Sequence, residues 1–284
     1  MLFLDVKGAF NNVSKVRLIN TLKDIGIPTQ LISWIDCFMS NRLIKLAFDG
    51  KTEILKPVET GIPQGSPISP ILFLLYLTPL FNELKLKHPS INCPSYIDDI
   101  GLVATNRLER LNIIELERAA ETAFKWAADN TVAFDDIKLE LIHFNSNGEG
   151  NKLEITLLNN IKIKLSNNIR WLGVYFDGKL KFQTHVKTKI AAANRIFNYI
   201  SNLANLEKGL SSKALIQLYK SCICSVSDFG AEIWWKGQKS LIKDLRILQN
   251  KITRKIIDTF KTTPIYLLDI EASILLPEIR LNNL

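Results

Sequence analysis

Three aspartates stand beside short apolar runs, where an acidic side chain is unexpected. Asp5 ends the run 2–4, and Asp98 and Asp99 lie inside the segment 96–100. Burying a carboxylate is costly unless a cation or a hydrogen-bond donor compensates it. Carboxylate oxygens suit Mg²⁺, and two such ions about 3.5–4 Å apart can drive in-line phosphoryl transfer. A doubled aspartate is also typical of an ordinary turn, so this pair alone does not identify a metal site.

The backbone around the paired acids decides which of them can reach a shared ion. If residues 96–100 form a tight hairpin, both acids lie at its tip. If the segment stays extended, Asp98 and Asp99 point to opposite faces, and one is better aimed at a metal. The sequence leaves both arrangements open.

A loop rich in glycine, proline and serine over residues 61–70 precedes the apolar run 71–77. The small residues would let the backbone approach a ligand closely. Gln64 offers both a donor and an acceptor there. A rigid loop in which Ser66 or Ser69 caps the following helix explains the same pattern.

The secondary structure predicted from the sequence changes near residue 180, from mixed strands and helices to helices alone. Alternating or continuous apolar runs predict strands before that point, and helical periodicity appears between them. The predicted strands cover 2–6, 43–48, 100–104, 139–144, 155–157 and 171–176, and the predicted helices cover 14–25, 28–40, 68–85 and 107–129. Helices are expected at 184–205, 211–227 and 238–260, with Gly209 and Gly237 as breaks.

Charge is distributed unevenly along the 284 residues, whose net charge is +8. Residues 179–262 hold sixteen Lys or Arg against five acids. This pattern fits a module that meets a polyanion, and it equally fits a solvated helical surface. The Cys and His spacing does not suit a structural zinc site. With no signal peptide or spanning segment expected, the chain is predicted to be intracellular, in cytoplasm or nucleus, and independent of membranes.

Five segments in order resemble motifs A to E of reverse transcriptases, with phrasing most similar to non-LTR (LINE-type) retrotransposon polymerases. They are Asp5-Val6-Lys7-Gly8-Ala9-Phe10, the loop 61–67, Tyr96-Ile97-Asp98-Asp99, the stretch 130–140, and Trp171-Leu172-Gly173-Val174. Any one of them is weak evidence, but five in order over residues 1 to about 178 are specific.

The resemblance implies an α+β fold of the right-hand polymerase type. Residues 1–180 would form the palm, a mixed sheet plus helices, with partial fingers, and residues 181–284 an all-helical basic thumb and C-terminal connection. The implied activity is RNA-directed DNA synthesis, which adds dNTPs to a DNA primer on an RNA template. Oligomeric state stays open.

The resemblance also assigns roles to individual residues. Asp5 and Asp98 would ligate two Mg²⁺ ions, for which Mn²⁺ can substitute, and Asp99 would complete the acidic cluster. Lys138 would protonate pyrophosphate, although a plain surface lysine is the commoner role.

The remaining assignments concern the nucleotide and the primer. Phe10 would exclude a 2′-hydroxyl, although core packing also explains it, and Gln64 with Gly65 would line the incoming nucleotide. Residues 171–174 would lie in the primer grip. The basic helices would follow duplex phosphates, and the pair Trp234-Trp235 is expected mainly in the core.

The match departs from the family at its start. Met1 lies four residues before Asp5, so the fingers strands that precede motif A are expected to be missing, as in an N-terminally truncated fragment. Asn11 replaces the more frequent Asp, at a position that is not a metal ligand. Missing fingers would weaken nucleotide positioning. The alternative function is therefore a catalytically inactive remnant that only binds nucleic acid.

Overall fold

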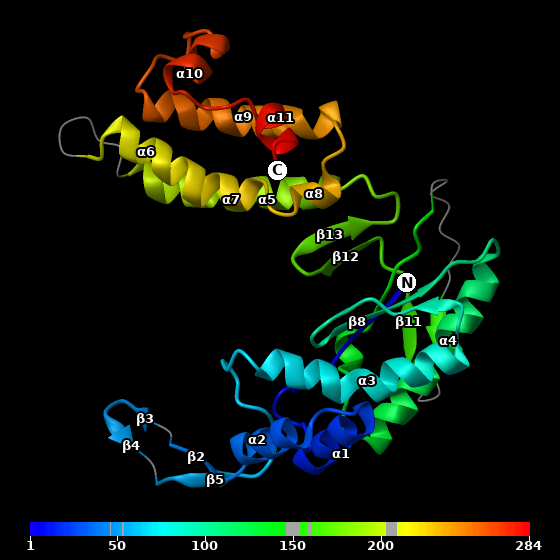
Figure 1. The fold of residues 1–284 in the computed structure, drawn as a ribbon. Coiled ribbons are helices and arrows are strands. Elements are labelled where there is room, and N and C mark those ends of the chain that lie inside the picture. The colour runs from blue at the N-terminus through cyan, green and yellow to red at the C-terminus, as the bar shows by residue number, and fades with distance from the viewer. Residues whose placement is uncertain (46, 53, 146–153, 158–160, 203–208) are drawn as a thin grey trace. The chain divides into compact units, whose positions relative to one another are not determined.

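The chain forms two compact units, which are described separately (Figure 1). The computed structural model describes residues 1–284 except 46, 53, 146–153, 158–160 and 203–208. The first unit comprises Met1–His143 and Glu149–Ser166, and the second comprises Phe144–Gly148 and Asn167–Leu284.

An antiparallel sheet with strand order β6-β8-β1-β9 forms the base of the first unit, and β7 pairs with β8 beside it. The strands are β1 (Leu2–Asp5), β6 (Ile91–Asn92), β7 (Ser95–Tyr96), β8 (Asp99–Ala104) and β9 (Glu140–Leu141). Leu2 and Leu4 of β1 and Ile100 and Leu102 of β8 are buried, and burial of such side chains is the main favourable term in folding. Apolar burial therefore holds β1 and β8 together at the centre of the sheet.

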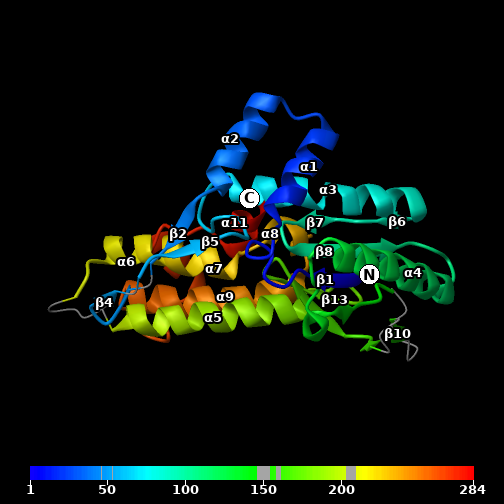
Figure 2. The same ribbon diagram turned by 90° about the horizontal axis from the view of Figure 1, so that it is seen from below.

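Helices pack on this sheet and on one another. They are α1 (Lys15–Ile25), α2 (Thr29–Met39), α3 (Ser69–Lys87), α4 (Glu109–Asp129) and the short 3₁₀ turn η1 (Asp136–Lys138). Contacts join α3 to α1 and α4, and α4 to β8, and Figure 2 shows α1 and α2 side by side. Phe73, Leu77, Leu80 and Leu84 recur at helical spacing on α3 and are buried. The four helices predicted in this region are confirmed.

Short hairpins complete the first unit, and two predicted strands differ from those observed. The remaining strands are β2 (Arg42–Ile44), β3 (Ala47–Phe48), β4 (Lys51–Thr52), β5 (Lys56–Val58), β10 (Glu154–Thr156) and β11 (Lys162–Lys164). The single strand predicted over 43–48 is wrong, because β2 pairs with β5 whereas β3 pairs with β4. The strand predicted over 139–144 shortens to β9, which pairs with β1.

The second unit contains one hairpin and a set of helices. The hairpin strands are β12 (Asn168–Trp171) and β13 (Val174–Asp177), and the helices are α5 (Gln183–Ser201), α6 (Ser212–Leu218), the π-helical η2 (Tyr219–Cys224), α7 (Ser225–Ser227), α8 (Ala231–Trp234), α9 (Lys239–Ile256), α10 (Ile265–Glu271) and α11 (Pro277–Asn282). α5 packs against η2, α7 and α9. No strand follows Asp177 within the described residues, and the helices predicted there are found, although 203–205 lie outside the described residues.

The single strand predicted over 171–176 is wrong. Leu172 and Gly173 have positive φ values of 49° and 81°, so the chain turns between β12 and β13. A Cβ on Gly173 would lie 3.1 Å from the ring of Phe229, which explains a glycine at this turn. The hairpin belongs to the same compact unit as the helices, and the predicted palm–thumb division at 180 stays a prediction.

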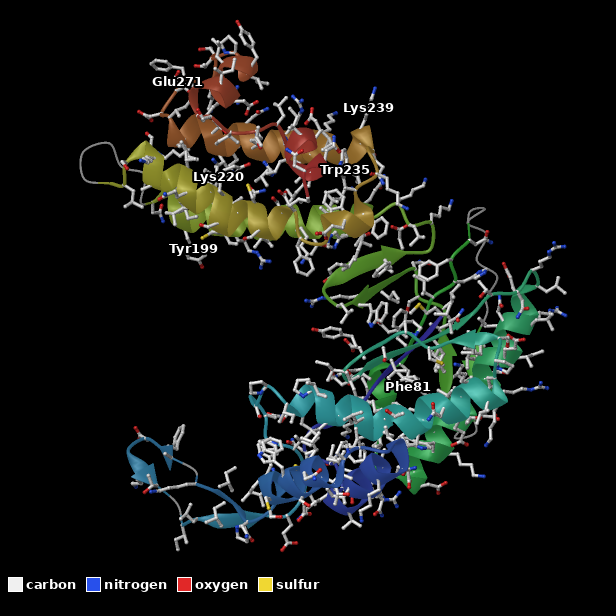
Figure 3. All side chains as sticks on the ribbon, in the orientation of Figure 1. Phe81, Tyr199, Lys220, Trp235, Lys239 and Glu271 are labelled. Carbon is white, nitrogen blue, oxygen red and sulfur yellow. The ribbon has the colours of Figure 1, made fainter. Side chains whose placement is uncertain are left out.

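The two neighbouring tryptophans have different environments. Trp234 is fully buried, and Trp235 is half-buried with its ring edge-on to Trp234 at 6.2 Å. Trp235, which is labelled in Figure 3, donates from Nε1 to Asn282 Oδ1 at 2.7 Å. The core position expected for this pair is confirmed for Trp234.

None of the helices in the described residues combines the length and apolar character that a membrane-spanning segment requires.

Candidate active site

Strand pairing brings the three aspartates together. In the antiparallel register of β1 and β8, Asp5 lies opposite Asp99. Asp98 lies in the connection between β7 and β8, and its carbonyl accepts a hydrogen bond from Val6 N at 3.1 Å. Residues more than ninety positions apart in sequence thus share one end of the β1–β8 pair.

The turn that carries Asp98 is a two-residue hairpin, which decides between the two arrangements left open by the sequence. Ser95 pairs with Ile100 and Tyr96 with Asp99, so Ile97 and Asp98 form the loop. Ile97 has a φ of 57°, a conformation that is unfavourable for a β-branched residue. Such strain costs on the order of 1–3 kcal/mol and persists only when the surroundings enforce it. Packing of Ile97 against the core provides that constraint and places Asp98 at the tip.

Lys138 is the cation nearest to the acids. Its Nζ donates to Asp5 Oδ2 at 2.9 Å and lies 3.8 Å from Asp135 Oδ2. Asp135 N donates to Asp5 O at 2.9 Å, and the Asp135 carboxylate accepts from Ile137 N at the start of η1. The structure therefore adds Asp135, which the sequence analysis missed. Its signal was an acidic pair, 135–136, directly after the buried Phe134.

The electrostatics of the cluster favour a cation. Burial raises the pKa of the Asp99 carboxyl, and the neighbouring Asp98 and Asp5 carboxylates raise it further, against the opposing effect of Lys138. The hydrogen bond to Asp5 raises the pKa of the exposed Lys138 ammonium. The carboxylates thus repel one another, and Lys138 supplies part of the compensating charge.

The donor set fits a hard divalent cation in its chemistry, because carboxylate oxygens are the ligands that Mg²⁺ prefers. With the side chains as they lie, no group of three or more His, Cys, Asp or Glu residues in the described part of the chain is arranged to hold a metal. Asp5 is instead engaged by Lys138. Lys138 thus already neutralises part of the negative charge that a metal ion would meet at Asp5.

Phe10 lies in the loop that follows β1. Its ring packs against Phe73 of α3, with ring centroids 5.5 Å apart. Its carbonyl accepts a hydrogen bond from Ile62 N at 2.6 Å. Phe10 is half-buried, so the structure gives it a packing role and leaves part of the ring accessible.

Gln64 and Gly65 belong to the loop before α3, which is joined to the Phe10 loop by close backbone contact. Gln64 lines a cavity of about 550 Å³ together with Asn11 and Arg42. Gly65 is exposed and has a φ of 87°. The β1–β8 pair thus carries the acids, whereas Gln64 and Gly65 belong to the loop before α3.

Arg42 holds the Gln64 loop and was not expected from the sequence. Its Nη2 donates to the carbonyls of Thr60 and Gly61, each at 2.7 Å, and its Nε donates to Met39 O at 3.2 Å. The sequence gives little indication that Arg42 would bind backbone carbonyls, because an arginine on a surface strand usually remains solvated.

The hairpin expected at the primer grip is anchored within the second unit. The fully buried His185 accepts from Tyr175 N at Nδ1, 3.3 Å away, and its Nε2 lies 3.0 Å from Phe229 O. Trp234 Nε1 also donates to Phe229 O at 3.0 Å. Burial lowers the pKa of His185, which favours the neutral ring that these hydrogen bonds require.

Comparison of the chain with known proteins identifies its family. The family model described as reverse transcriptase (RNA-dependent DNA polymerase) matches residues 1–176. The RNA-directed DNA polymerase from mobile element jockey of Drosophila melanogaster is 25% identical over 257 residues, which are 89% of this chain and 28% of that protein. The Pol polyprotein from type-1 retrotransposable element R1 of Bradysia coprophila is 24% identical, over 82% of this chain and 23% of its own length.

Solved structures give a more distant likeness. Telomerase from Candida albicans, in complex with a fragment of telomeric RNA, aligns with a TM-score of 0.41 and 14% identity, over 100% of this chain and 50% of that chain. The chain spans less than a third of the two retrotransposon relatives named above. The assignment drawn from the five ordered motifs is confirmed, and the chain belongs to the reverse transcriptase family, with relatives among non-LTR retrotransposons.

Proposed function

We propose that this chain is the polymerase region of an RNA-directed DNA polymerase, which adds dNTPs to a DNA primer on an RNA template. The observation that carries the proposal is the β1–β8 register, which sets Asp5 opposite Asp99 with Asp98 in the adjoining turn. Two carboxylates on neighbouring strands and a third at a strained tip make a compact anionic site at a strand end. Membership of the reverse transcriptase family supports the same reading.

Asp5 and Asp98 would hold two Mg²⁺ ions, with Asp99 completing the cluster. When bound, these ions would supply the positive charge that lowers the pKa of the primer 3′-hydroxyl and stabilises the leaving pyrophosphate. Because Lys138 Nζ donates to Asp5 Oδ2, a metal ion at Asp5 would share this carboxylate with Lys138 or displace the lysine.

Lys138 has a second role in the proposal. A lysine ammonium is protonated at neutral pH, and the contact with Asp5 raises its pKa further. Once released from Asp5, this ammonium could donate its proton to a pyrophosphate oxygen as the P–O bond breaks. Asp135, 3.8 Å from Nζ, would keep the lysine near the site.

Phe10, Gln64 and Gly65 would contact the nucleotide. The backbone hydrogen bond from Ile62 N to Phe10 O joins the loop of Phe10 to the loop of Gln64, which supports a shared role, and the Phe10 ring would exclude a 2′-hydroxyl. Residues 1–180 would act as palm with partial fingers and residues 181–284 as thumb, where the basic helices would follow duplex phosphates.

A second candidate is a protein that binds nucleic acid without synthesis. The observation in its favour is the engagement of Asp5 by Lys138, together with the unformed metal site in the described residues. It predicts binding that weakens steeply with salt and no extension of a primer.

Primer extension on poly(rA)·oligo(dT) with Mg²⁺ distinguishes the two. We expect synthesis by the natural chain and none by Asp98→Asn, with equal circular dichroism spectra. Asp136→Asn, an exposed acid outside the proposed ligand set, is the matched control and should keep activity. A folded natural chain that extends no primer would exclude the polymerase for this chain and favour the binding protein.

A further inference from the structure

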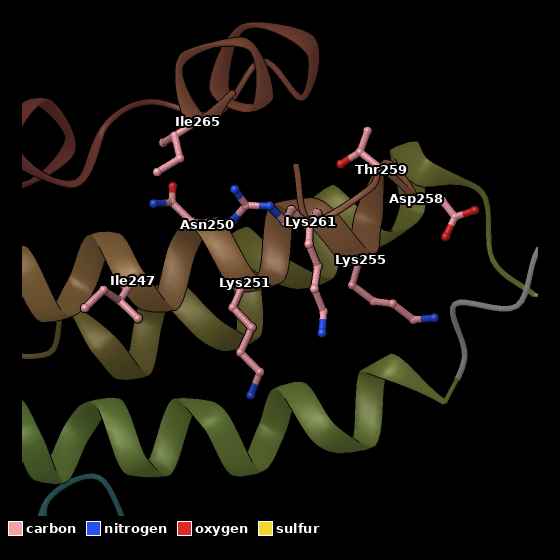
Figure 4. Close-up of a pocket in the computed structure, with 9 residues that line it drawn as sticks. Ile247, Asn250, Lys251, Lys255, Asp258, Thr259, Lys261 and Ile265 are labelled. Atoms are coloured by element: carbon pink, nitrogen blue, oxygen red, sulfur yellow. The ribbon is translucent and has the colours of Figure 1, made fainter. Parts of the chain in front are cut away.

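A basic cavity of about 620 Å³ lies at the end of α9 in the second unit (Figure 4). Four cationic residues line it, Lys251, Arg254, Lys255 and Lys261, against one acid, Asp258. We call this cavity the α9 pocket. Lys251 and Lys261 extend to the same side of the helix in Figure 4 although they come from different segments.

Local backbone geometry forms the pocket. Asp258 has a positive φ of 48°, and Thr259 N donates to Arg254 O at 3.1 Å, so α9 ends in a left-handed turn. The chain then folds back, and Arg254 NH2 donates to Thr263 O at 3.3 Å. This hydrogen bond ties the helix to the returning segment, which brings Lys261 beside the last turns of the helix.

Helix capping does not account for all of the charge. Arg254 and Lys255 lie in the last turn, where cations interact favourably with the helix dipole. Lys251 lies a turn earlier, where it donates to Asn194 Oδ1 at 3.1 Å, and Lys261 lies outside the helix. Neither Lys255 nor Lys261 forms an ion pair within the described residues, and Asp258 is the one acid that lines the pocket, so positive charge is in excess there.

Two unsatisfied polar atoms belong to the same pocket. Arg254 Nε and Thr259 Oγ1 are buried and have no hydrogen-bond partner within the described residues. Both residues line the cavity. A buried donor without an acceptor costs about 1–3 kcal/mol, so a ligand with acceptor oxygens would recover that loss after a small side-chain adjustment.

We infer that the α9 pocket binds a phosphate group, contributed by a nucleic acid strand. A guanidinium among ammonium groups is the combination that recognises phosphate oxygens. The volume exceeds what one phosphate fills, and Ile247 and Ile265 give the pocket apolar wall against which an adjoining sugar or base can pack. The anion site rests on the cavity alone, and its assignment to nucleic acid rests on the proposed function.

Fluorescence anisotropy of a labelled oligouridylate with the full chain tests the inference. We expect Lys261→Gln and Arg254→Gln each to weaken binding about five- to tenfold at physiological salt. The matched control is Lys23→Gln, at an exposed position of α1 in the first unit, outside the basic helices. It removes the same charge and should change affinity less than twofold.

Competition with inorganic phosphate at constant ionic strength identifies the source of the ligand. Displacement of the oligouridylate from the natural chain, lost in Lys261→Gln, supports the inference. Phosphate binding that depends on Lys261 while the oligouridylate binds all variants equally would overturn the nucleic acid assignment. Equal weakening by Lys23→Gln and Lys261→Gln would overturn the pocket itself, since it would show diffuse attraction to the net charge of the chain.

Two controls keep the result interpretable. Thermal melting establishes that each variant is folded, and the exposed Lys261 carries the test if Arg254→Gln does not fold. Asp98→Asn should bind the oligouridylate like the natural chain, so loss of synthesis and loss of the pocket are separate outcomes.

Discussion

Replacing Gly61 by alanine tests how the loop before α3 is joined to the loop after β1. Gly61 has a φ of 80°, and a Cβ there would lie 2.8 Å from the carbonyl oxygens of both Phe10 and Asn11. A left-handed conformation costs a non-glycine residue about 1–2 kcal/mol. Overpacking against backbone that cannot rotate away adds about 1–3 kcal/mol. We therefore expect Gly61→Ala to lower the free energy of unfolding by about 2–5 kcal/mol.

Gly65→Ala is the matched control, because it separates backbone strain from steric conflict. Gly65 has a φ of 87°, and nothing lies within 4 Å of its Cβ position. Its substitution should cost only the conformational part, about 1–2 kcal/mol. Urea unfolding followed by circular dichroism measures both. Equal losses in the two variants would refute the steric reasoning and would mean that the 10–11 and 61–62 loops are not held in contact.

Two further predictions concern the second unit. His185 is neutral when buried, so the unfolded chain binds more protons below its ordinary pKa of about 6.5. The melting temperature should therefore fall as the pH drops below about 6.5. His185→Gln can keep both hydrogen bonds and should make the melting temperature less dependent on pH in this range. An unchanged pH dependence in this variant would contradict a neutral, buried His185. Asp228 accepts from Arg280 at 2.5 and 3.1 Å in a mostly buried pair. Asp228→Ala should cost about 3–5 kcal/mol in urea unfolding, because it leaves the mostly buried Arg280 charge without its carboxylate, although Nη1 still donates to Tyr219 and Gln249. A loss below about 1 kcal/mol would show that these neutral acceptors or water compensate the charge.

Local pattern was enough for much of the fold. The helices of both units follow apolar periodicity, and α3 and α9 bury one apolar side chain per turn, as the spacing predicts. Strand extents were less predictable. Leu172 and Gly173 form a turn inside what looked like one strand, because an apolar run of six residues fits either a strand or a short hairpin.

In the candidate site, residue types could be predicted from the sequence, whereas contacts between distant residues could not. Asp5, Asp98, Asp99 and Lys138 could be singled out from residue type and motif order. Asp135 and Arg42 could not, because their importance comes from a backbone hydrogen bond to Asp5 and from three carbonyls that converge on one guanidinium. Those partners are distant in sequence, and no local pattern encodes them.

The sequence by itself determined the family, the acidic residue types and the contrast between a mixed region and a basic helical one, because motif order, charge and periodicity are properties of the chain alone. Only the tertiary structure decided that β1 pairs with β8 so that Asp5 lies opposite Asp99, that Ile97 takes a strained turn, and that Lys138 forms an ion pair with Asp5. Strand register and ion pairing depend on which distant surfaces bury each other, and that is set by packing of the whole unit.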